Sequence, residues 1–396
     1  MLPVELVEAE KLESLAREVG LDNWTTDLES ALASTEYPVY FDAQITSLRA
    51  DAVRAALQAG KHVYCEKPLA EDVNGALDLA RLAAKLRIKS GVVQDKLFLP
   101  GLVKLRELID SGFFGRILSV KGDFGYWVFE GHDREPQRPS WNYRREDGGG
   151  IILDMFPHWH YVLSGLFGRI DSLICTGATH IEKRVDENGQ GYEATADDAA
   201  YATFRLADGV IAQMNSSWCT RVYRDELLML QVDGTRGSAV AGLRGCKTQT
   251  AEQTAPASWN PDLPNPIDFR SGWTDVPDSL NYENGFKEQW TSFISHIVED
   301  TPCCPRRTGR SNAMNSAANP SNRRRMAARF ILALSMQPFM WCAIHCERRL
   351  RLPPQMWTGT QRSPTGRIYG RWGSALPRPW TLRNGEWGSP GRRRAN

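Results

Sequence analysis

The sequence predicts an α/β domain with a parallel sheet, then an α+β domain with an open, mostly antiparallel sheet, and finally an irregular C-terminal tail. In residues 1–115, short apolar runs alternate with helical patterns, and such strands pair in parallel because a crossover helix connects them. In residues 116–302, β-rich runs are joined by tight turns, which indicate antiparallel hairpins. From residue 303 to 396 the chain is arginine-rich and has no regular period. We therefore expect domain boundaries near residues 115 and 302.

In the first domain, apolar residues recur at helical spacing over residues 4–19, and Gly20 supplies a helix stop. The apolar run at residues 38–45 is short enough to be a buried strand. The elements expected after these are a helix at 28–33, a helix at 50–59, a strand at 62–65, a helix at 73–86 and a strand at 91–94.

In the second domain, β-rich runs at residues 199–206 and 210–218 flank the turn sequence Ala-Asp-Gly, and the run at 227–232 leads into Asp-Gly. We expect an open sheet with helices on one face only. An amphipathic stripe over residues 284–299 predicts a final helix that packs against the rest of the fold.

The charge is divided unevenly along the chain. The net charge is +1, but residues 303–396 contain 18 arginines, no lysine and two acidic residues, together with five of the 13 tryptophans. Arginine, proline, glycine and tryptophan codons predominate when GC-rich DNA is read out of frame, so we interpret this segment as a disordered product of a shifted frame. The alternative is a basic tail that binds nucleic acid through phosphate contacts and stacking, which its apolar runs disfavour.

Composition excludes several classes of protein. Hydrophobic residues make up 42% of the chain and charged residues 24%, which does not fit a wholly disordered protein. No apolar run approaches the roughly 20 residues that span a bilayer, and the first ten residues do not resemble a signal peptide. The eight cysteines include no CxxC pair. We expect a cytoplasmic location, with no membrane partner and no metal site.

The tripeptide Glu66-Lys67-Pro68 lies where a strand of the parallel sheet is expected to end, and open α/β sheets bind their ligands at this edge. A lysine there can be partly desolvated beside a cofactor and can donate a hydrogen bond to a substrate oxygen. The alternative is a solvated surface lysine.

A second candidate is the block of residues 148–160, in which three glycines precede an apolar run, Asp154 and His158. The glycines allow the backbone to approach a ligand closely. The i, i+4 spacing places Asp154 and His158 on one helix face, where an imidazole beside a carboxylate is a tunable acid or base. A metal site that includes His160 is disfavoured, because a two-residue spacing turns this residue to a different face.

These motifs resemble the Gfo/Idh/MocA oxidoreductases (glucose-fructose oxidoreductase, inositol dehydrogenase and relatives). The resemblance runs from about residue 4 to residue 302 and includes the Glu-Lys-Pro motif, the turn at 111–115 and the Gly-Gly-Gly-x-x-x-Asp-x-x-x-His block. It implies an NAD- or NADP-dependent transfer of hydride between nicotinamide and an alcohol or ketone of a sugar, cyclitol or related polyol. It also implies that Lys67, Asp154 and His158 are catalytic, with His158 exchanging the hydroxyl proton.

The resemblance extends to further positions. We expect Thr46, Glu66, Lys67 and Gln94 to contact the cofactor, and Trp141, Tyr143, Arg144 and His180 to contact the substrate. The competing interpretations are turn capping for Thr46 and Gln94, packing or surface charge for residues 141–144, and a structural role for His180. The family's open sheet implies a homo-oligomer that forms through the second domain.

The sequence departs from the family pattern at both ends. No strand followed by GxGxxG precedes the expected strand at 38–45, and the string at 189–194 does not follow a strand. We therefore expect an incomplete Rossmann-type sheet that lacks its phosphate-binding segment. We therefore expect that a chain with this sequence can lack enzyme activity. The alternative function is that of a non-catalytic subunit or assembly module that uses the open sheet.

Overall fold

The computed structural model describes residues 4–44, 46–279, 282–301, 330–334 and 343–345. The chain divides into two compact units, one formed by residues 1–37 and 320–396 and the other by residues 38–319. Each unit is described by itself below.

The smaller unit contains two helices and three short strands among its described residues. Strand β16 pairs with both β1 and β15, in each case antiparallel. Helix α2 begins after Asp27, whose side chain accepts a hydrogen bond from Ser30 N at 3.0 Å. Strands β15 and β16 lie in the segment expected to be irregular, and most of that segment is outside the described residues. The bounds are α1 (Val4–Val19), β1 (Asn23–Thr25), α2 (Leu28–Ala33), β15 (Phe330–Leu334) and β16 (Ala343–His345).

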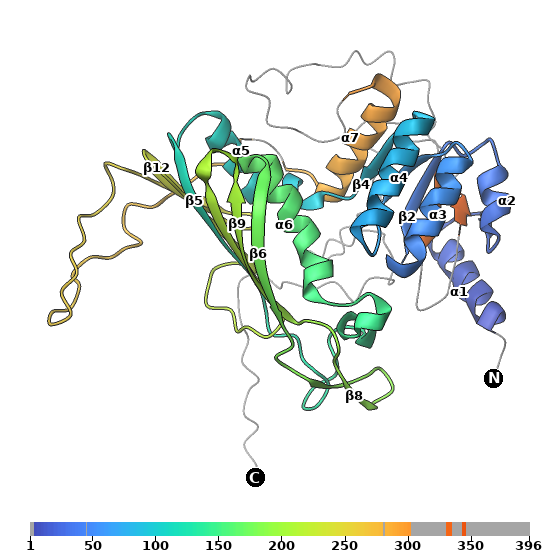
Figure 1. Cartoon of the computed structure of the whole chain (residues 1–396), viewed down its shortest axis with the longest axis horizontal. Coiled ribbons are helices and arrows are strands. Elements are labelled where there is room, and N and C mark those ends of the chain that lie inside the picture. The colour runs from blue at the N-terminus through green and yellow to red at the C-terminus, as the bar shows by residue number, and fades with distance from the viewer. Residues whose placement is uncertain (1–3, 45, 280–281, 302–329, 335–342, 346–396) are drawn as a thin grey trace, which may run out of the picture. The chain divides into compact units, whose positions relative to one another are not determined.

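The larger unit begins with three strands, β2, β3 and β4, that pair in parallel in chain order. Helices α3 and α4 connect them, which confirms the predicted α/β arrangement (Figure 1). Asp72 caps α4 by accepting a hydrogen bond from Gly75 N at 2.9 Å. The bounds are β2 (Val39–Ala43), α3 (Thr46–Gln58), β3 (His62–Cys65), α4 (Val73–Leu86) and β4 (Ser90–Val92).

The beginning of α3 differs from the prediction. The helix begins at Thr46 rather than at residue 50, and the strand before it ends at Ala43. Arg49 explains the difference, because its guanidinium Nε lies 3.1 Å from the buried carboxylate of Asp42 and its Nη1 lies 2.5 Å from Pro68 O. A buried ion pair of this kind holds the first turn of the helix in place. The pattern of polar and apolar residues in the sequence does not show that two charged residues will pair.

The second sheet has eight strands in the order β14-β13-β12-β11-β5-β10-β9-β6. Strands β5 and β10 pair in parallel, and the other neighbours pair antiparallel, as predicted. A two-stranded ribbon, β7 with β8, lies outside this sheet. The bounds are β5 (Ile117–Gly125), β6 (Ile170–Ala178), β7 (Lys183–Val185), β8 (Gly191–Glu193), β9 (Ala199–Leu206), β10 (Ile211–Ser217), β11 (Leu228–Gly234), β12 (Gly237–Ala241), β13 (Cys246–Thr250) and β14 (Thr274–Asp275).

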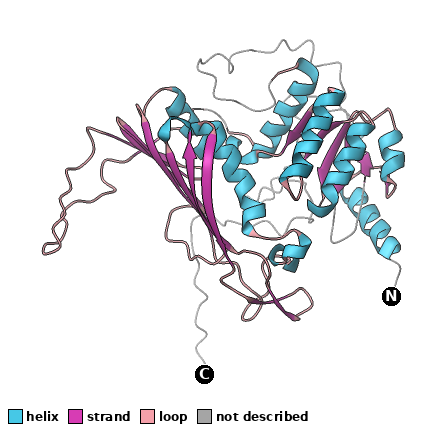
Figure 2. Ribbon diagram, viewed as in Figure 1, coloured by secondary structure: helices cyan, strands magenta, loops and turns pink. Residues whose placement is uncertain are grey.

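Helices α5 (Pro100–Asp110) and α6 (Ile151–Phe167) cover one face of this sheet (Figures 1 and 2). Strand β9 alternates accordingly, with Ala202 and Phe204 buried and Tyr201 exposed. Among the described residues, no helix covers the other face. The predicted open sheet with helices on one side is therefore confirmed.

Helix α7 (Gly285–Glu299) packs on the parallel strands. The ring of Phe293 stacks on Tyr64 with centroids 4.5 Å apart, and Trp290 makes edge contacts with Phe41 and Tyr64 at 4.9 Å. This confirms the predicted packing helix. The described residues include no helix that is both long and apolar enough to cross a membrane. Among its described residues, the unit also has four short 3₁₀ turns: η1 (Asp95–Phe98), η2 (Ser140–Tyr143), η3 (Arg145–Asp147) and η4 (Ala207–Gly209).

Candidate active site

The site lies within the larger unit, where the parallel strands end. Lys67 follows β3 by two residues, and Gln94 follows β4 by two residues. The carboxyl ends of parallel strands meet at one edge of a sheet, which is where such folds bind ligands. A cavity of about 230 Å³ opens at this edge, lined by the loop after β3, the end of β4 and helix α6.

The glycine block fixes the start of α6. A Cβ added at Gly149 would lie only 2.4 Å from the Trp141 carbonyl oxygen, so the backbone passes too close for any side chain. Gly150 has a positive φ of 118° and offers no side chain to cap the helix. Asp197 supplies the cap instead, because its Oδ2 accepts a hydrogen bond from Ile152 N at 2.8 Å.

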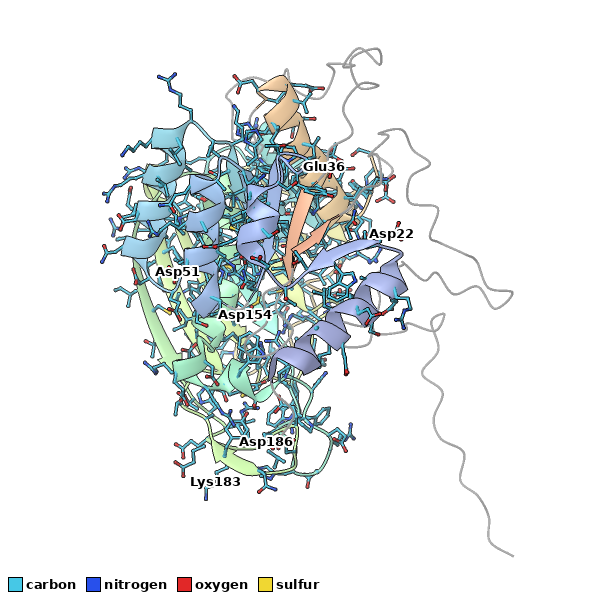
Figure 3. The ribbon with its side chains drawn as sticks, turned by 90° about the vertical axis from the view of Figure 1, so that its right-hand side faces the viewer. Asp22, Glu36, Asp51, Asp154, Lys183 and Asp186 are labelled. Atoms are coloured by element: carbon cyan, nitrogen blue, oxygen red, sulfur yellow. The ribbon has the colours of Figure 1, made fainter. Side chains whose placement is uncertain are left out.

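Asp154 lies in the first turn of α6, between two cations. Lys67 Nζ donates to Asp154 Oδ1 at 2.5 Å and to the Asp154 carbonyl oxygen at 3.0 Å, and Arg138 Nη1 donates to Oδ2 at 3.2 Å. Burial opposes ionisation of this carboxyl, but Lys67 and Arg138 more than offset it and hold its pKa well below the usual range. Asp154 therefore carries a negative charge, and the two cations hold it in place. Figure 3 labels this residue.

His158 lies one turn further along α6 and is buried. Its Nδ1 lies 2.6 Å from the hydroxyl of Tyr161. Burial, with the nearby charges of Lys96 and Lys67, lowers the pKa of His158 to about 3, although Asp95 and Asp154 act in the opposite direction. The imidazole is therefore neutral at physiological pH, which is the form that can accept a proton.

The ammonium group of Lys67 has one donor left over. A lysine ammonium carries three protons, and both hydrogen bonds that the described residues give it end on Asp154. The third proton can point to a substrate or cofactor oxygen. Lys67 and Asp154 are thus joined by hydrogen bonds, and Lys67 lines the cavity. The charges of both residues act on His158, although no described hydrogen bond joins His158 to either of them.

The three other predicted cofactor residues lie at the same edge. Thr46 is buried at the start of α3, and a Cβ added at Gly148 would lie 3.8 Å from the Thr46 Cβ. Glu66 accepts a hydrogen bond from the Lys67 amide at 3.3 Å, and burial raises the pKa of its carboxyl. Gln94 lines the cavity, and its backbone N–H donates a hydrogen bond to Gln289 Oε1 at 2.9 Å.

The predicted substrate residues have other described partners. Tyr143 is buried beneath the guanidinium of Arg184, which lies 3.7 Å from its ring centroid, and Arg144 lies over the ring of Tyr192 at 4.8 Å. His180 is exposed and contacts Tyr201 at 3.2 Å. Trp141 supplies the carbonyl against which Gly149 packs. The structure does not connect any of these four to Asp154 or His158 through a described hydrogen bond.

Four polar residues of the site were not predicted from the sequence. Arg138 contacts Asp154, and the other three, Asp95, Lys96 and Tyr161, form a network next to His158. A weak signal was available for one of them, since Tyr161 follows His158 by three residues and so shares its helix face. No cluster that could hold a metal ion is found among the described histidines, cysteines and carboxylates.

Two family descriptions match the chain. One, an oxidoreductase family with an NAD-binding Rossmann fold, matches residues 6–92, and the other, a GFO/IDH/MocA C-terminal domain, matches residues 102–240. The chain belongs to the Gfo/Idh/MocA family of oxidoreductases. Membership confirms the resemblance inferred from the motifs, and the Rossmann-type sheet confirms the predicted fold.

Two curated relatives are named as a D-xylose dehydrogenase and a levoglucosan dehydrogenase. The chain is 53% identical over 292 residues to a D-xylose dehydrogenase from Paenarthrobacter nicotinovorans, a match covering 73% of this chain and 75% of the relative. It is 26% identical over 258 residues to a levoglucosan dehydrogenase from Pseudarthrobacter phenanthrenivorans, covering 60% of this chain and 65% of the relative.

Solved structures share the fold. The apo form of a levoglucosan dehydrogenase superposes with a TM-score of 0.63 at 21% identity, covering 74% of this chain and 79% of that one. The same enzyme with NADH and L-sorbose gives a TM-score of 0.62 at 21% identity, covering 73% and 78%. At this level of identity the superpositions establish the architecture.

Proposed function

We propose that this chain is an NAD- or NADP-dependent dehydrogenase that oxidises a hydroxyl group of a sugar, with a pentose such as D-xylose as the first candidate. The observation that supports the proposal most strongly is the Lys67–Asp154 pair at the end of the parallel strands, where Lys67 lines the cavity and both charges act on the buried His158. The D-xylose dehydrogenase at 53% identity supports the choice of sugar.

The residues around the cavity fit the nicotinamide end of the cofactor. The cavity is somewhat smaller than the roughly 300 Å³ typical of ligand sites, so it suits one ring rather than a whole dinucleotide. Val92 and Val93 give it an apolar wall, and Lys67 and Gln94 give it polar groups. Thr46 and Glu66 complete the set of residues that would hold the cofactor. When bound, nicotinamide supplies the carbon that accepts a hydride from the sugar.

The chain's own residues then have distinct tasks. The free proton of the Lys67 ammonium hydrogen-bonds the reacting oxygen of the sugar and stabilises negative charge that develops there. Asp154 holds the Lys67 ammonium through two hydrogen bonds and is itself held by Arg138. His158, kept neutral by burial, accepts the proton of the sugar hydroxyl as the C–H bond breaks.

Steady-state turnover tests the proposal. The full chain is mixed with D-xylose and NAD⁺ or NADP⁺, and formation of the reduced cofactor is followed by absorbance. Lys67→Ala and His158→Ala should each lower kcat by roughly 10² to 10⁴, the usual contribution of such groups, and His158→Ala should leave the cofactor affinity little changed. Lys85→Ala, which removes an exposed lysine of α4, should keep the parent rate. Full activity in either site variant would remove that residue from the mechanism.

A second candidate function is a non-catalytic subunit that assembles through the open sheet, as a homo-oligomer. The supporting observation is the exposure of large apolar side chains on the edge strand β6, with Ile174 79% exposed and Leu173 53% exposed. A titration of tryptophan fluorescence with NADH and NADPH separates the two functions. Micromolar binding favours the enzyme, and no binding combined with a stable oligomer in solution favours the assembly module.

A further inference from the structure

A chain of hydrogen bonds extends from His158 through Tyr161, which lines the cavity, to Asp95. His158 Nδ1 lies 2.6 Å from Tyr161 Oη, and Tyr161 Oη lies 3.2 Å from Asp95 Oδ1. The backbone N–H of Lys96 also donates to Tyr161 Oη, at 3.3 Å, and Lys96 Nζ lies 2.6 Å from Asp95 Oδ2. The rings of His158 and Tyr161 meet edge to face, with centroids 5.5 Å apart. All four residues belong to η1 and α6.

The direction of these hydrogen bonds follows from the protons available. Asp95 is ionised, because Lys96 and its other partners more than offset the effect of burial and lower the pKa of its carboxyl. An ionised carboxylate can only accept, so the single hydroxyl proton of Tyr161 is donated to Asp95. The oxygen of Tyr161 then has two lone pairs, one for the Lys96 amide and one for His158. His158 Nδ1 must therefore be the donor in its contact with Tyr161.

We infer that Tyr161 and Asp95 are positioning residues that hold His158 in the tautomer with its proton on Nδ1. In this tautomer Nε2 has a free lone pair, and the described residues give it no hydrogen bond. The inference rests on the proposed function, because it is the Nε2 atom that accepts the sugar's hydroxyl proton. Free histidine favours the other tautomer, with the proton on Nε2, so the arrangement has to be imposed by the surrounding structure.

The same network fits the charge that develops during reaction. When Nε2 takes the substrate proton, the imidazole becomes a cation whose Nδ1–H still points to Tyr161. The Asp95 carboxylate, whose Oδ1 lies 3.8 Å from Nδ1, then stabilises that cation. The charged groups facing the ring are Asp95 and Lys96 on η1, Lys67 after β3, and Asp154 on the same helix. The two lysines oppose protonation and the two carboxylates favour it.

The tautomer can be measured directly, without any assay of activity. The full chain is labelled with ¹⁵N-histidine, and the imidazole nitrogens are observed by NMR near neutral pH. The His158→Gln variant identifies the His158 signals by their loss. A protonated Nδ1 and an unprotonated Nε2 are expected in the parent chain. In Tyr161→Phe, His158 should shift toward the Nε2–H tautomer. A parent chain with the proton on Nε2, or a Tyr161→Phe spectrum unchanged at His158, would overturn the inference.

Turnover of matched variants gives a second readout. Tyr161→Phe should lower kcat by roughly 10-fold or more, as loss of a partner that orients a catalytic base does, with a much smaller change in KM. Asp95→Asn keeps an oxygen that can accept from Tyr161, so it should lose less than Asp95→Ala. Tyr282→Phe is the matched control, because the hydroxyl of Tyr282 has no hydrogen-bond partner among the described residues. Equal losses in all four variants would contradict a positioning role.

The two tests separate this inference from the proposed function. If the parent chain turns over no sugar, the proposed function fails, while the NMR spectrum still reports the tautomer. If the spectrum shows the Nε2–H form in an active chain, the positioning inference fails and the dehydrogenase stands.

Discussion

His158 connects the chemistry of the site to the pH dependence of stability. Its pKa in the folded chain is about 3, below the ordinary value of 6.5, because burial and the two lysines disfavour the cation. Between these two values the unfolded chain binds a proton that the folded chain does not. The free energy of unfolding must therefore rise with pH across this window, and the folded state loses stability as the pH falls below 6.5.

We predict that this residue contributes up to about 1.4 kcal/mol per pH unit to that slope. Denaturant unfolding of the parent chain at several pH values between 6.5 and 4.5 should show the loss, and His158→Gln should flatten the curve. His160→Gln removes an exposed histidine of the same helix and should keep the parent slope. An unchanged slope in His158→Gln would mean that the imidazole is not held neutral by the fold.

At the residue scale, two short motifs predicted Lys67, Asp154 and His158 as catalytic residues, and their catalytic roles stay predictions. In the structure Lys67 and Asp154 are in contact, and the charges of both act on His158. The partners that set their charge and orientation were missed. Arg138 and Asp95 lie 16 and 63 residues from the side chains they contact, and such distances in the chain leave no periodic trace.

At the scale of elements, the beginning of α6 determines where Asp154 lies. The helix starts after Gly149 and Gly150, which pass close to the backbone of η2 and to the side chain of Asp197. The close approach predicted at these glycines was expected to be to a ligand. In the structure, these glycines lie close to the protein's own backbone and to Asp197, and Asp154 in the first turn of the helix contacts Lys67.

We predict that Gly149→Ala destabilises the chain by about 1–3 kcal/mol, the usual result of forcing an atom into packed backbone. The added Cβ would lie 2.4 Å from the Trp141 carbonyl oxygen and 2.6 Å from that of Asn142. Gly191→Ala is the matched control, because nothing lies within 4 Å of its Cβ position. Denaturant unfolding measures both variants. A Gly149→Ala chain as stable as Gly191→Ala would show that η2 does not press against the glycine block.

The boundaries of strands and helices were less accurately predicted than their order. Strands β2 to β4 and helix α7 lie where the apolar patterns placed them, because burial sets the period. The start of α3 was misplaced by four residues, since it depends on the buried contact between Asp42 and Arg49. Ion pairs between distant positions are invisible to a pattern of polar and apolar residues.

At the scale of the whole molecule, the family and the order of the two sheets follow from the sequence, and both are confirmed. The predicted boundaries near residues 115 and 302 stay predictions, as does the shifted frame after residue 302. The short strands β15 and β16 lie in that last segment. The expected lack of a phosphate-binding segment also stays a prediction, and a cofactor-binding measurement on the whole chain tests it.

The most direct test of the account is to follow the hydrogen that the site is proposed to transfer. The full chain is incubated with NAD⁺ or NADP⁺ and D-xylose that carries deuterium at every carbon, and the reduced cofactor is analysed by mass spectrometry. We expect one deuterium to appear on the nicotinamide ring, and the rate of its appearance should fall sharply in Lys67→Ala. No reduced cofactor from D-xylose or any other aldose, by a chain that binds NADH, would contradict it.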